Sequence, residues 1–121
     1  MANGPAATLI FPCCVPEGLA YAGAARERGE KVVAASSLAC DTTAGRFETW
    51  FRLPSIYDGD FVQHLEHAVA KYDITRIYCP VPVAHVALRR LAREGKLSVP
   101  LVGEMPGRRF AREHRKPDGI G

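Results

Sequence analysis

Short apolar runs alternate along this chain with segments of helical periodicity. The run from Thr8 to Pro12 is β-branched and apolar, and it predicts a first strand after a small-residue leader. Pro16 and Glu17 suit the first turn of a helix, because that turn needs no proline N–H and favours a carboxylate. We expect this helix to reach Arg28 and to stop at Gly29. Small side chains form its predicted inner face, at Leu19, Ala22 and Gly23.

Two further strands are expected before the next helix. Lys31 to Ser36 is a second apolar run, separated from the first helix by a short connection. Arg46 to Leu53 alternates imperfectly between polar and aromatic residues and ends at Pro54, which suits an edge strand or an extended crossover.

The second half of the chain repeats the helix and strand pattern. Asp58 or Asp60 is expected to cap a helix with one apolar stripe, formed by Phe61, Val62, Leu65, Ala68, Val69 and Tyr72. Thr75 to Cys79 predicts another strand, and a third helix should follow Pro80 and stop at Gly95. Val99 to Val102 is expected to close the sheet.

This order of elements predicts an α/β fold: a single Rossmann-like three-layer domain with a mostly parallel sheet of about five strands and three main helices. We assign it to residues 1–104, whose 11 Lys/Arg balance 11 Asp/Glu. Residues 105–121 carry five Lys/Arg against two Asp/Glu, and we interpret them as a basic linker or the start of a connecting helix.

The composition argues against several classes of protein. Basic residues in the last segment have few interleaved aromatic residues, so no nucleic-acid partner is expected. No membrane partner is expected either, because the sequence has no apolar run of 18 residues. The N-terminus lacks the basic residues of a signal peptide, and we therefore predict a cytoplasmic protein with reduced thiols.

The candidate site is the edge of the sheet where the parallel strands end. Cys13 and Cys14 follow the first strand, Cys40 follows the second, and Cys79 ends the strand after the second helix. All four thiols should therefore lie near the crevice in which such sheets bind ligands. Their spacing fits no metal site, and packing as small apolar residues is the favoured interpretation.

Polar residues at the same edge are further candidates. Glu17 opens the first helix, whereas Ser36, Ser37 and Asp41 follow the second strand, where nucleotide-binding sheets place a ribose acceptor. Ordinary loop capping is the favoured alternative for these three. No G-x-G-x-x-G pattern accompanies them.

Histidines offer one more hypothesis. His85 stands near the start of the third helix, and a Cys79–His85 dyad that activates the thiol is conceivable. His64 and His67 share the polar face of the second helix, where a solvated pair is the favoured interpretation. We name no catalytic residue and no metal ligand from the sequence.

From Thr8 to about Pro106, the chain resembles the N-terminal Rossmann-like domain of ATP-grasp enzymes, the pre-ATP-grasp domain. The similarity lies in the first strand with its alanine-rich helix, in the second strand, and above all in the middle of the chain. The corresponding segments are Leu9–Pro12, Arg26–Gly29, Lys31–Ser36, Ala44–Phe47, Phe51–Pro54, Asp60–Leu65 and Ile74–Pro80.

The resemblance implies a chain that is not a ligase by itself. The ATP-binding domains of the family are not part of this sequence, so a downstream domain of the same polypeptide is the expected partner. The family's glycine-rich first turn is replaced by Pro12 to Pro16. Because two prolines there lack N–H groups, we expect no cofactor and no ATP or NAD binding tighter than about millimolar.

We therefore expect a non-catalytic module that binds a small-molecule ligand or docks a partner domain. Two alternatives remain open: a sensory input domain of a signalling protein, and a small thiol-dependent enzyme that uses the crevice cysteines. A homodimer is compatible with each of them.

Overall fold

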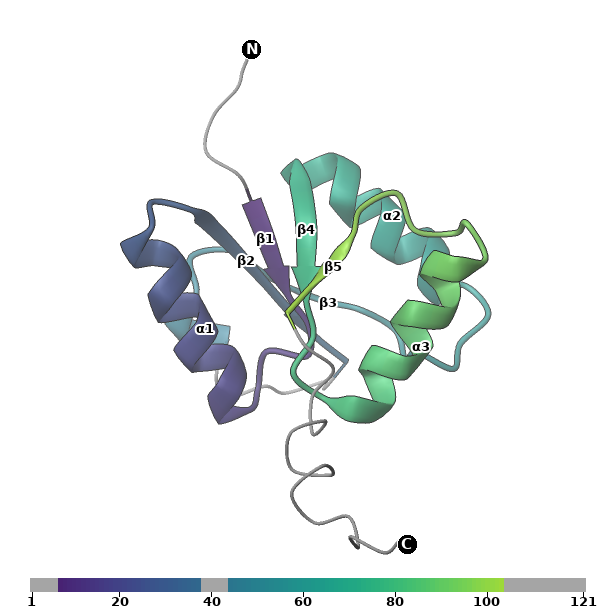
Figure 1. The fold of residues 1–121 in the computed structure, drawn as a ribbon, viewed down its shortest axis with the longest axis horizontal. Coiled ribbons are helices and arrows are strands. Elements are labelled where there is room, and N and C mark those ends of the chain that lie inside the picture. Colours follow the sequence, from purple (N-terminus) through teal and green to yellow (C-terminus); the bar gives the residue numbers. More distant parts are fainter. Residues whose placement is uncertain (1–6, 38–43, 104–121) are drawn as a thin grey trace, which may run out of the picture.

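Five parallel strands form the sheet of this protein, of which the computed structural model describes residues 7–37 and 44–103 (Figure 1). The strands are β1 (Ala7–Ile10), β2 (Lys31–Ser36), β3 (Trp50–Arg52), β4 (Ile74–Tyr78) and β5 (Leu101–Val102). The helices are α1 (Pro16–Glu27), α2 (Phe61–Tyr72) and α3 (Pro82–Arg93), with a 3₁₀ turn at Ala44–Arg46. The α/β fold expected from the sequence is confirmed, and every pairing in the described sheet is parallel.

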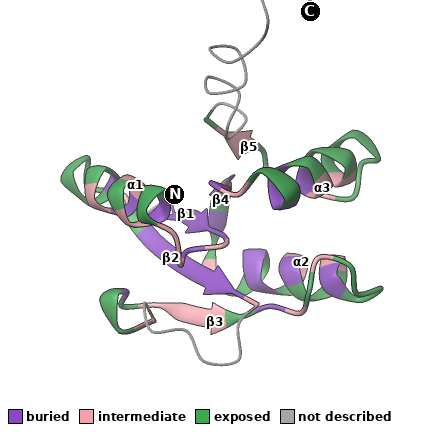
Figure 2. Cartoon of the chain, turned by 90° about the horizontal axis from the view of Figure 1, so that it is seen from below, coloured by how far each residue is buried: buried purple, intermediate pink, exposed green. Residues whose placement is uncertain are grey.

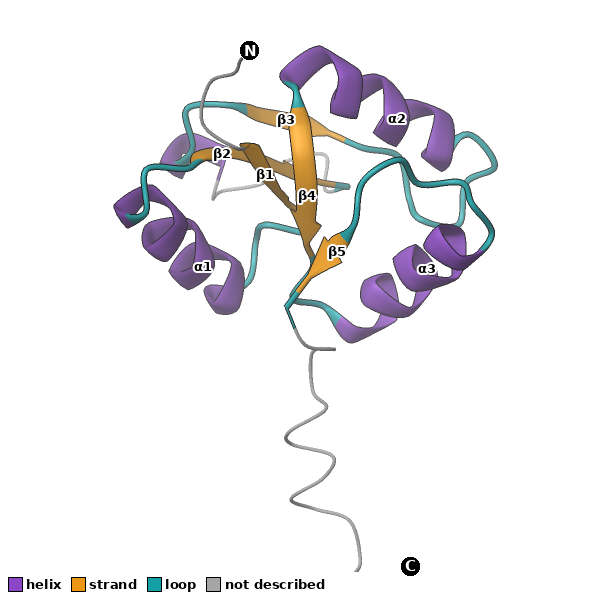
Figure 3. Cartoon of the chain, turned by 45° about the horizontal axis from the view of Figure 1, so that its top comes forward, coloured by secondary structure: helices purple, strands orange, loops and turns teal. Residues whose placement is uncertain are grey.

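The strands lie in the order β3-β2-β1-β4-β5, so the direction of chain progression reverses between β1 and β4. Figure 3 shows the sheet between α1 on one side and α2 and α3 on the other. The two faces have separate apolar cores because neighbouring strand residues point in opposite directions. Leu9 and Val33 pack with α2 and α3, whereas Ile10 and Ala34 pack with α1.

Burial follows this layered arrangement. Figure 2 shows β2 almost entirely buried and β3 only partly so, at the edge of the sheet. The edge position of β3 agrees with one of the two expectations for the segment before Pro54. A continuously apolar strand such as β2 is the usual pattern where both faces of a parallel sheet are covered.

The helix boundaries come from local chemistry that the sequence displays. Pro16 and Pro82 occupy the first turns of α1 and α3. Gly29 and Gly95 follow these helices with φ values of 82° and 75°, which a glycine adopts without strain. Asp60 is the N-cap of α2, but its side chain accepts no capping hydrogen bond there.

Three local expectations need correction. The first strand ends at Ile10 and not at Pro12, which lacks the N–H for further pairing. The last strand covers only two residues, because Pro100 can accept the hydrogen bond from Ile77 N–H at 2.9 Å but cannot donate one. The buried face of α1 consists of Gly18, Ala22 and Ala25, while Leu19 and Gly23 are only partly buried.

Candidate functional site

An open pocket of about 330 Å³ lies at the carboxyl edge of the sheet, and we call it the crevice pocket. Its apolar wall is formed by six residues: Phe11, Pro12, Ile56, Val81, Val83 and Ala84. Cys14, Ser36, Ser37 and Ser55 complete the lining, but almost all of the surface that the pocket exposes is apolar. No charged side chain is among the described lining residues. The pocket therefore gathers the loops after β1, β2 and β3 and the beginning of α3.

The turn after β1 does not offer the phosphate cradle of a dinucleotide site. Such cradles need free backbone N–H groups and a close approach that glycines allow. Here Phe11 N–H donates to Tyr78 O at 3.1 Å and Cys13 N–H donates to Ala35 O at 3.0 Å. Pro12 and Pro16 have no N–H to offer. The backbone of this turn is mostly committed to the sheet and to the start of α1.

One glycine of this turn has a packing role. A Cβ atom on Gly18 would lie 3.2 Å from Cys13 O and 3.3 Å from Ile10 Cγ2. Glycine at this position lets α1 approach β1 closely, which is the packing function of the last glycine in nucleotide-binding turns. The pattern from Cys13 to Gly18 thus shares that glycine with such turns, but residues with side chains stand at the two earlier glycine positions.

Only one of the described cysteines lines the pocket. Cys14 is partly exposed there, whereas Cys13 and Cys79 are buried, with exposed fractions of 0% and 1%. Burial raises the pKa of Cys79 to about 11, against a weaker opposing effect of the hydrogen bond to Val81 O at 3.5 Å. Within residues 7–37 and 44–103, no group of three His, Cys, Asp or Glu could hold a metal ion.

The two serines at the end of β2 have different environments. Ser37 Oγ donates to Pro54 O at 2.9 Å, which ties the end of β2 to the loop after β3 and agrees with a capping role. Ser36 is fully buried, its side chain lies on the same face of β2 as Ala34, toward α1, and its Oγ has no hydrogen-bond partner in the described part of the chain. An unpaired buried hydroxyl is unfavourable, but this one is not exposed to the pocket. Asp41 and Cys40 lie outside the described residues.

His85 is buried in α3, with 3% of its surface exposed, but it does not line the crevice pocket. Both ring nitrogens lack hydrogen-bond partners within the described ranges, while Cys79 Sγ donates to Val81 O. The conceivable Cys79–His85 dyad is therefore not formed. Burial lowers the pKa of His85, and the positive charge of Arg89 lowers it further.

The remaining candidates are on the surface. Glu17 is exposed in the first turn of α1 and does not line the pocket. His64 and His67 are exposed on α2, and His64 Nδ1 lies 2.9 Å from Asp60 O. Both histidines occupy the solvated face that the apolar stripe predicts.

Sequence reasoning reached the α3 side of the pocket only through His85, and it missed the residues of that side that line the pocket. The first N–H groups of a helix have no acceptor within the helix, and no side chain caps α3 in the described structure. Pro82 has no N–H, and His85 N–H donates to Val81 O at 2.8 Å. Val83 and Ala84, in the first turn of α3, line the pocket. Val81 and Val83 carry no titratable group, so only the proline that starts the helix could have indicated this site.

A second cavity, of about 380 Å³, lies between the loop before α2 and the C-terminal half of α3. Charged residues of both signs line it, among them Asp58, Arg90 and Glu94. Glu94 already pairs with Lys96 at 3.3 Å. None of the buried unpartnered polar atoms of the described chain belongs to its lining residues. The crevice pocket is therefore the better candidate for a ligand site.

Comparison with known proteins identifies no relative: no protein-family model matches the chain, and no curated protein matches its sequence. None of the described helices is long and apolar enough to cross a membrane.

Proposed function

We propose that this protein is a non-catalytic Rossmann-like module that binds a small, largely apolar ligand in the crevice pocket. The observation that carries the proposal is the position of an apolar pocket beside the strand-order reversal, lined by the segments after β1, β2 and β3 and by the start of α3. Ligands of open parallel sheets bind at such positions. A volume of about 330 Å³ is at the small end of the usual range for ligand pockets.

The resemblance to the N-terminal domain of ATP-grasp enzymes is part of this proposal. In that setting the module would bind its ligand beside a downstream domain of the same polypeptide. A cytoplasmic location also belongs to the proposal, supported by the finding that none of the three described cysteines is in a disulfide.

Two observations favour a binding module over a thiol-dependent enzyme. The thiol of Cys79 is buried, and its raised pKa of about 11 keeps it protonated at neutral pH. Cys14 reaches the pocket, but no histidine or carboxylate is among the described lining residues to act as its base.

Chemical-shift mapping with hexanamide, a small neutral amphipathic probe, tests the proposal. We expect the amide signals that move in the ¹⁵N-labelled protein to belong to the pocket, including Cys14, Ser37 and Val83. Val83→Trp should weaken binding, because Val83 lines the pocket and is 56% exposed, so a larger side chain can occupy the opening. Val86→Trp is the matched control, one turn away, 50% exposed and outside the pocket.

Shifts scattered over the surface would contradict the proposal. Equal effects of Val83→Trp and Val86→Trp would also contradict it, because the pocket would then have no special part in binding.

A further inference from the structure

We infer that the exposed side of α3 binds an acidic amphipathic helix of a partner protein, which packs antiparallel to α3. Apart from Val83, this surface lies outside the crevice pocket, so the inference goes beyond the proposed binding of a small ligand.

The first observation is the spacing of exposed residues on α3. Val83, Val86, Arg90 and Arg93 are exposed and follow one another at intervals of three, four and three residues. This is the spacing of the a and d positions of a heptad, so the four side chains share one face of the helix. We call these four residues the α3 seam. Figure 2 shows exposed residues along the outer side of α3.

The second observation is the exposure of apolar side chains. In the described chain, the exposed large apolar residues are Tyr57 (78%), Val83 (56%) and Val86 (50%). Tyr57 lies beside the same helix, because it lines the second cavity together with Arg90. Single exposed apolar residues are ordinary on a protein surface, whereas a group of them in one place is typical of a surface that binds another protein. The N-terminal half of the α3 seam therefore offers an apolar contact.

The third observation is the charge of the other half. Neither Arg90 nor Arg93 belongs to an ion pair of the described chain. Helix α3 contains no Asp or Glu, and Glu94, which follows Arg93, already pairs with Lys96 at 3.3 Å. Guanidinium groups bind carboxylates through two parallel hydrogen bonds. A partner that complements this half of the α3 seam therefore carries Asp or Glu.

The direction of the partner helix follows from the order of the two halves. An antiparallel partner places its N-terminal half against Arg90 and Arg93 and its C-terminal half against the valines. Its Asp or Glu residues then lie near its own N-terminus, where the helix dipole favours negative charge. The arginines of α3 likewise lie in the last turn of their helix, where the dipole favours cations. A parallel partner would carry its carboxylates at the unfavourable end.

A second copy of this chain does not complement the α3 seam. Parallel copies of α3 would bring the arginines of one copy against those of the other, and like charges repel. Antiparallel copies would place Arg90 and Arg93 against Val83 and Val86, which leaves the charges unpaired. An anionic membrane is also a poorer fit, because helices that lie on membranes present Trp, Phe or Leu, whereas the seam presents two valines.

Three capped peptides of two heptads test the inference. They have Leu at the seam positions of the second heptad and Ala or Gln outside the seam, and they differ only in carrying Glu, Gln or Lys at the seam positions of the first heptad. Calorimetric titration should show the Glu peptide binding about 10-fold more tightly than the Gln peptide, and the Lys peptide binding most weakly. The amide signals that move in the ¹⁵N-labelled protein should belong to α3, including Val86, Ala87 and Arg90.

Arg90→Glu provides the selective test, because it reverses the charge of an exposed side chain. It should weaken binding of the Glu peptide about 10-fold and strengthen binding of the Lys peptide about 10-fold, and this gain would show that the variant is folded. Lys71→Glu is the matched control, because Lys71 is exposed in the last turn of α2. It should leave both affinities within about 2-fold, since distant surface charges are screened by salt.

Val86→Ser tests the apolar half of the α3 seam. Because Val86 is half exposed, its replacement removes little from the core, and it should weaken binding of the Glu peptide about 5-fold. Binding of hexanamide in the crevice pocket should not change, because Val86 does not line that pocket.

Failure of the Glu peptide to bind, or equal affinities for the Glu and Gln peptides, would overturn the inference. Equal effects of Arg90→Glu and Lys71→Glu would overturn the position of the partner on α3. Sedimentation showing a wild-type dimer that Val86→Ser dissociates would assign the seam to a second copy instead. Binding to phosphatidylserine vesicles that Arg90→Glu abolishes, without binding of the Glu peptide, would assign it to a membrane. Each of these outcomes leaves hexanamide binding, and with it the proposed function, unaffected.

Discussion

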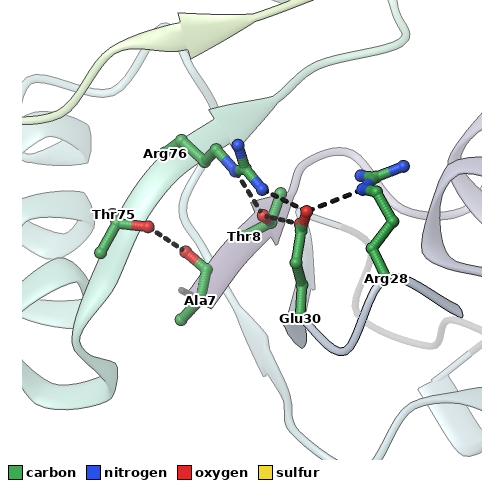
Figure 4. Close-up of polar contacts among 6 residues, drawn as sticks. All are labelled: Ala7, Thr8, Arg28, Glu30, Thr75 and Arg76. Atoms are coloured by element: carbon green, nitrogen blue, oxygen red, sulfur yellow. Dashed lines mark hydrogen bonds and ion pairs between the residues drawn. The ribbon is translucent and has the colours of Figure 1, made fainter. Parts of the chain in front are cut away.

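Arg76 of β4 forms an ion pair with Glu30, which directly precedes β2, and the pair spans the central strand β1 (Figure 4). The same carboxylate accepts hydrogen bonds from Arg28 Nε at 2.8 Å and from Thr8 Oγ1 at 3.0 Å. Arg76 Nε also donates to Thr8 Oγ1 at 3.0 Å. Three neighbouring strands are thus joined by side chains at their amino ends, opposite the crevice pocket.

Glu30→Gln should lower the free energy of unfolding of the domain, and the size of this loss should depend on pH. The hydrogen bonds from Arg28, then Arg76, lower the pKa of Glu30 to about 2. Because the folded pKa lies below the ordinary value of 4.5, the stabilisation is complete above about pH 4.5 and is lost as the pH falls toward 2. Urea unfolding at neutral pH should show a loss of about 1–2 kcal/mol.

The matched control is Glu94→Gln, which removes an exposed ion pair with Lys96 at 3.3 Å. It should change the free energy of unfolding by less than about 0.5 kcal/mol. Equal losses of unfolding free energy in the two variants would show that the stability of the three joined strands does not depend on the contacts of Glu30.

His85 should make the domain less stable in mild acid. Its folded pKa is lowered by burial and then by Arg89, so the unfolded chain binds the proton more readily. The free energy of unfolding is therefore not reduced by His85 above about pH 6.5, and it declines as the pH falls below that value. His85→Leu should flatten the pH dependence of unfolding below pH 6.5, and Arg89→Gln should reduce it. If His85→Leu kept the pH dependence of unfolding of the wild-type protein, a group other than His85 would be its cause.

Two glycines of α1 should respond to alanine with opposite signs. At Gly18 a new Cβ would crowd Cys13 O and Ile10 Cγ2, and we expect a loss of about 1 kcal/mol or more. At Gly23 a new Cβ would meet nothing within 4 Å, so alanine should add about 0.5–1 kcal/mol through its helix propensity. Thermal unfolding of both variants compares them directly. A gain at Gly18 would mean that α1 can move away from β1 at little cost.

The fold was largely predictable because its signals are local. The stripe from Phe61 to Tyr72, the prolines that start α1 and α3, and the glycines that follow them all act within one or two turns of helix. The extent of β5 was less predictable. Val99 resembles its strand neighbours in chemistry, but it packs into the core outside the strand, while the neighbouring Pro100 shortens the pairing.

The position of the crevice pocket was predictable, but its lining was not. Strand ends place Cys14, Ser36 and Ser37 at the crevice pocket, as parallel topology requires. The apolar wall comes from Ile56 and Val83, whose side chains resemble any core residue until the chain folds. From the sequence alone, Cys14 and Cys79 are equal candidates for a reactive thiol. Their reactivity differs because Cys79 is buried, and that burial depends on how α3 covers the end of β4.

Nucleotides should bind weakly. Calorimetric titration with ATP or NAD should show no affinity tighter than about millimolar, because the turn from Phe11 to Pro16 keeps few free N–H groups. Micromolar affinity for either nucleotide would contradict this prediction.

The described thiols should differ sharply in their reaction with iodoacetamide. Cys14 is partly exposed at the crevice pocket, whereas Cys79 is 1% exposed and has its pKa raised to about 11 by burial. At pH 8 the thiolate form of Cys79 is therefore rare, and its sulfur is also inaccessible to the reagent. Peptide mass spectrometry over time should show Cys14 modified first and Cys79 modified only after the domain is unfolded in urea. Cys14→Ser is the control that removes the fast signal. Hexanamide should slow the reaction of Cys14 but not the unfolded-state reaction of Cys79. Rapid modification of Cys79 in the folded domain would show that the end of β4 opens readily, and it would restore the thiol-dependent enzyme as a candidate.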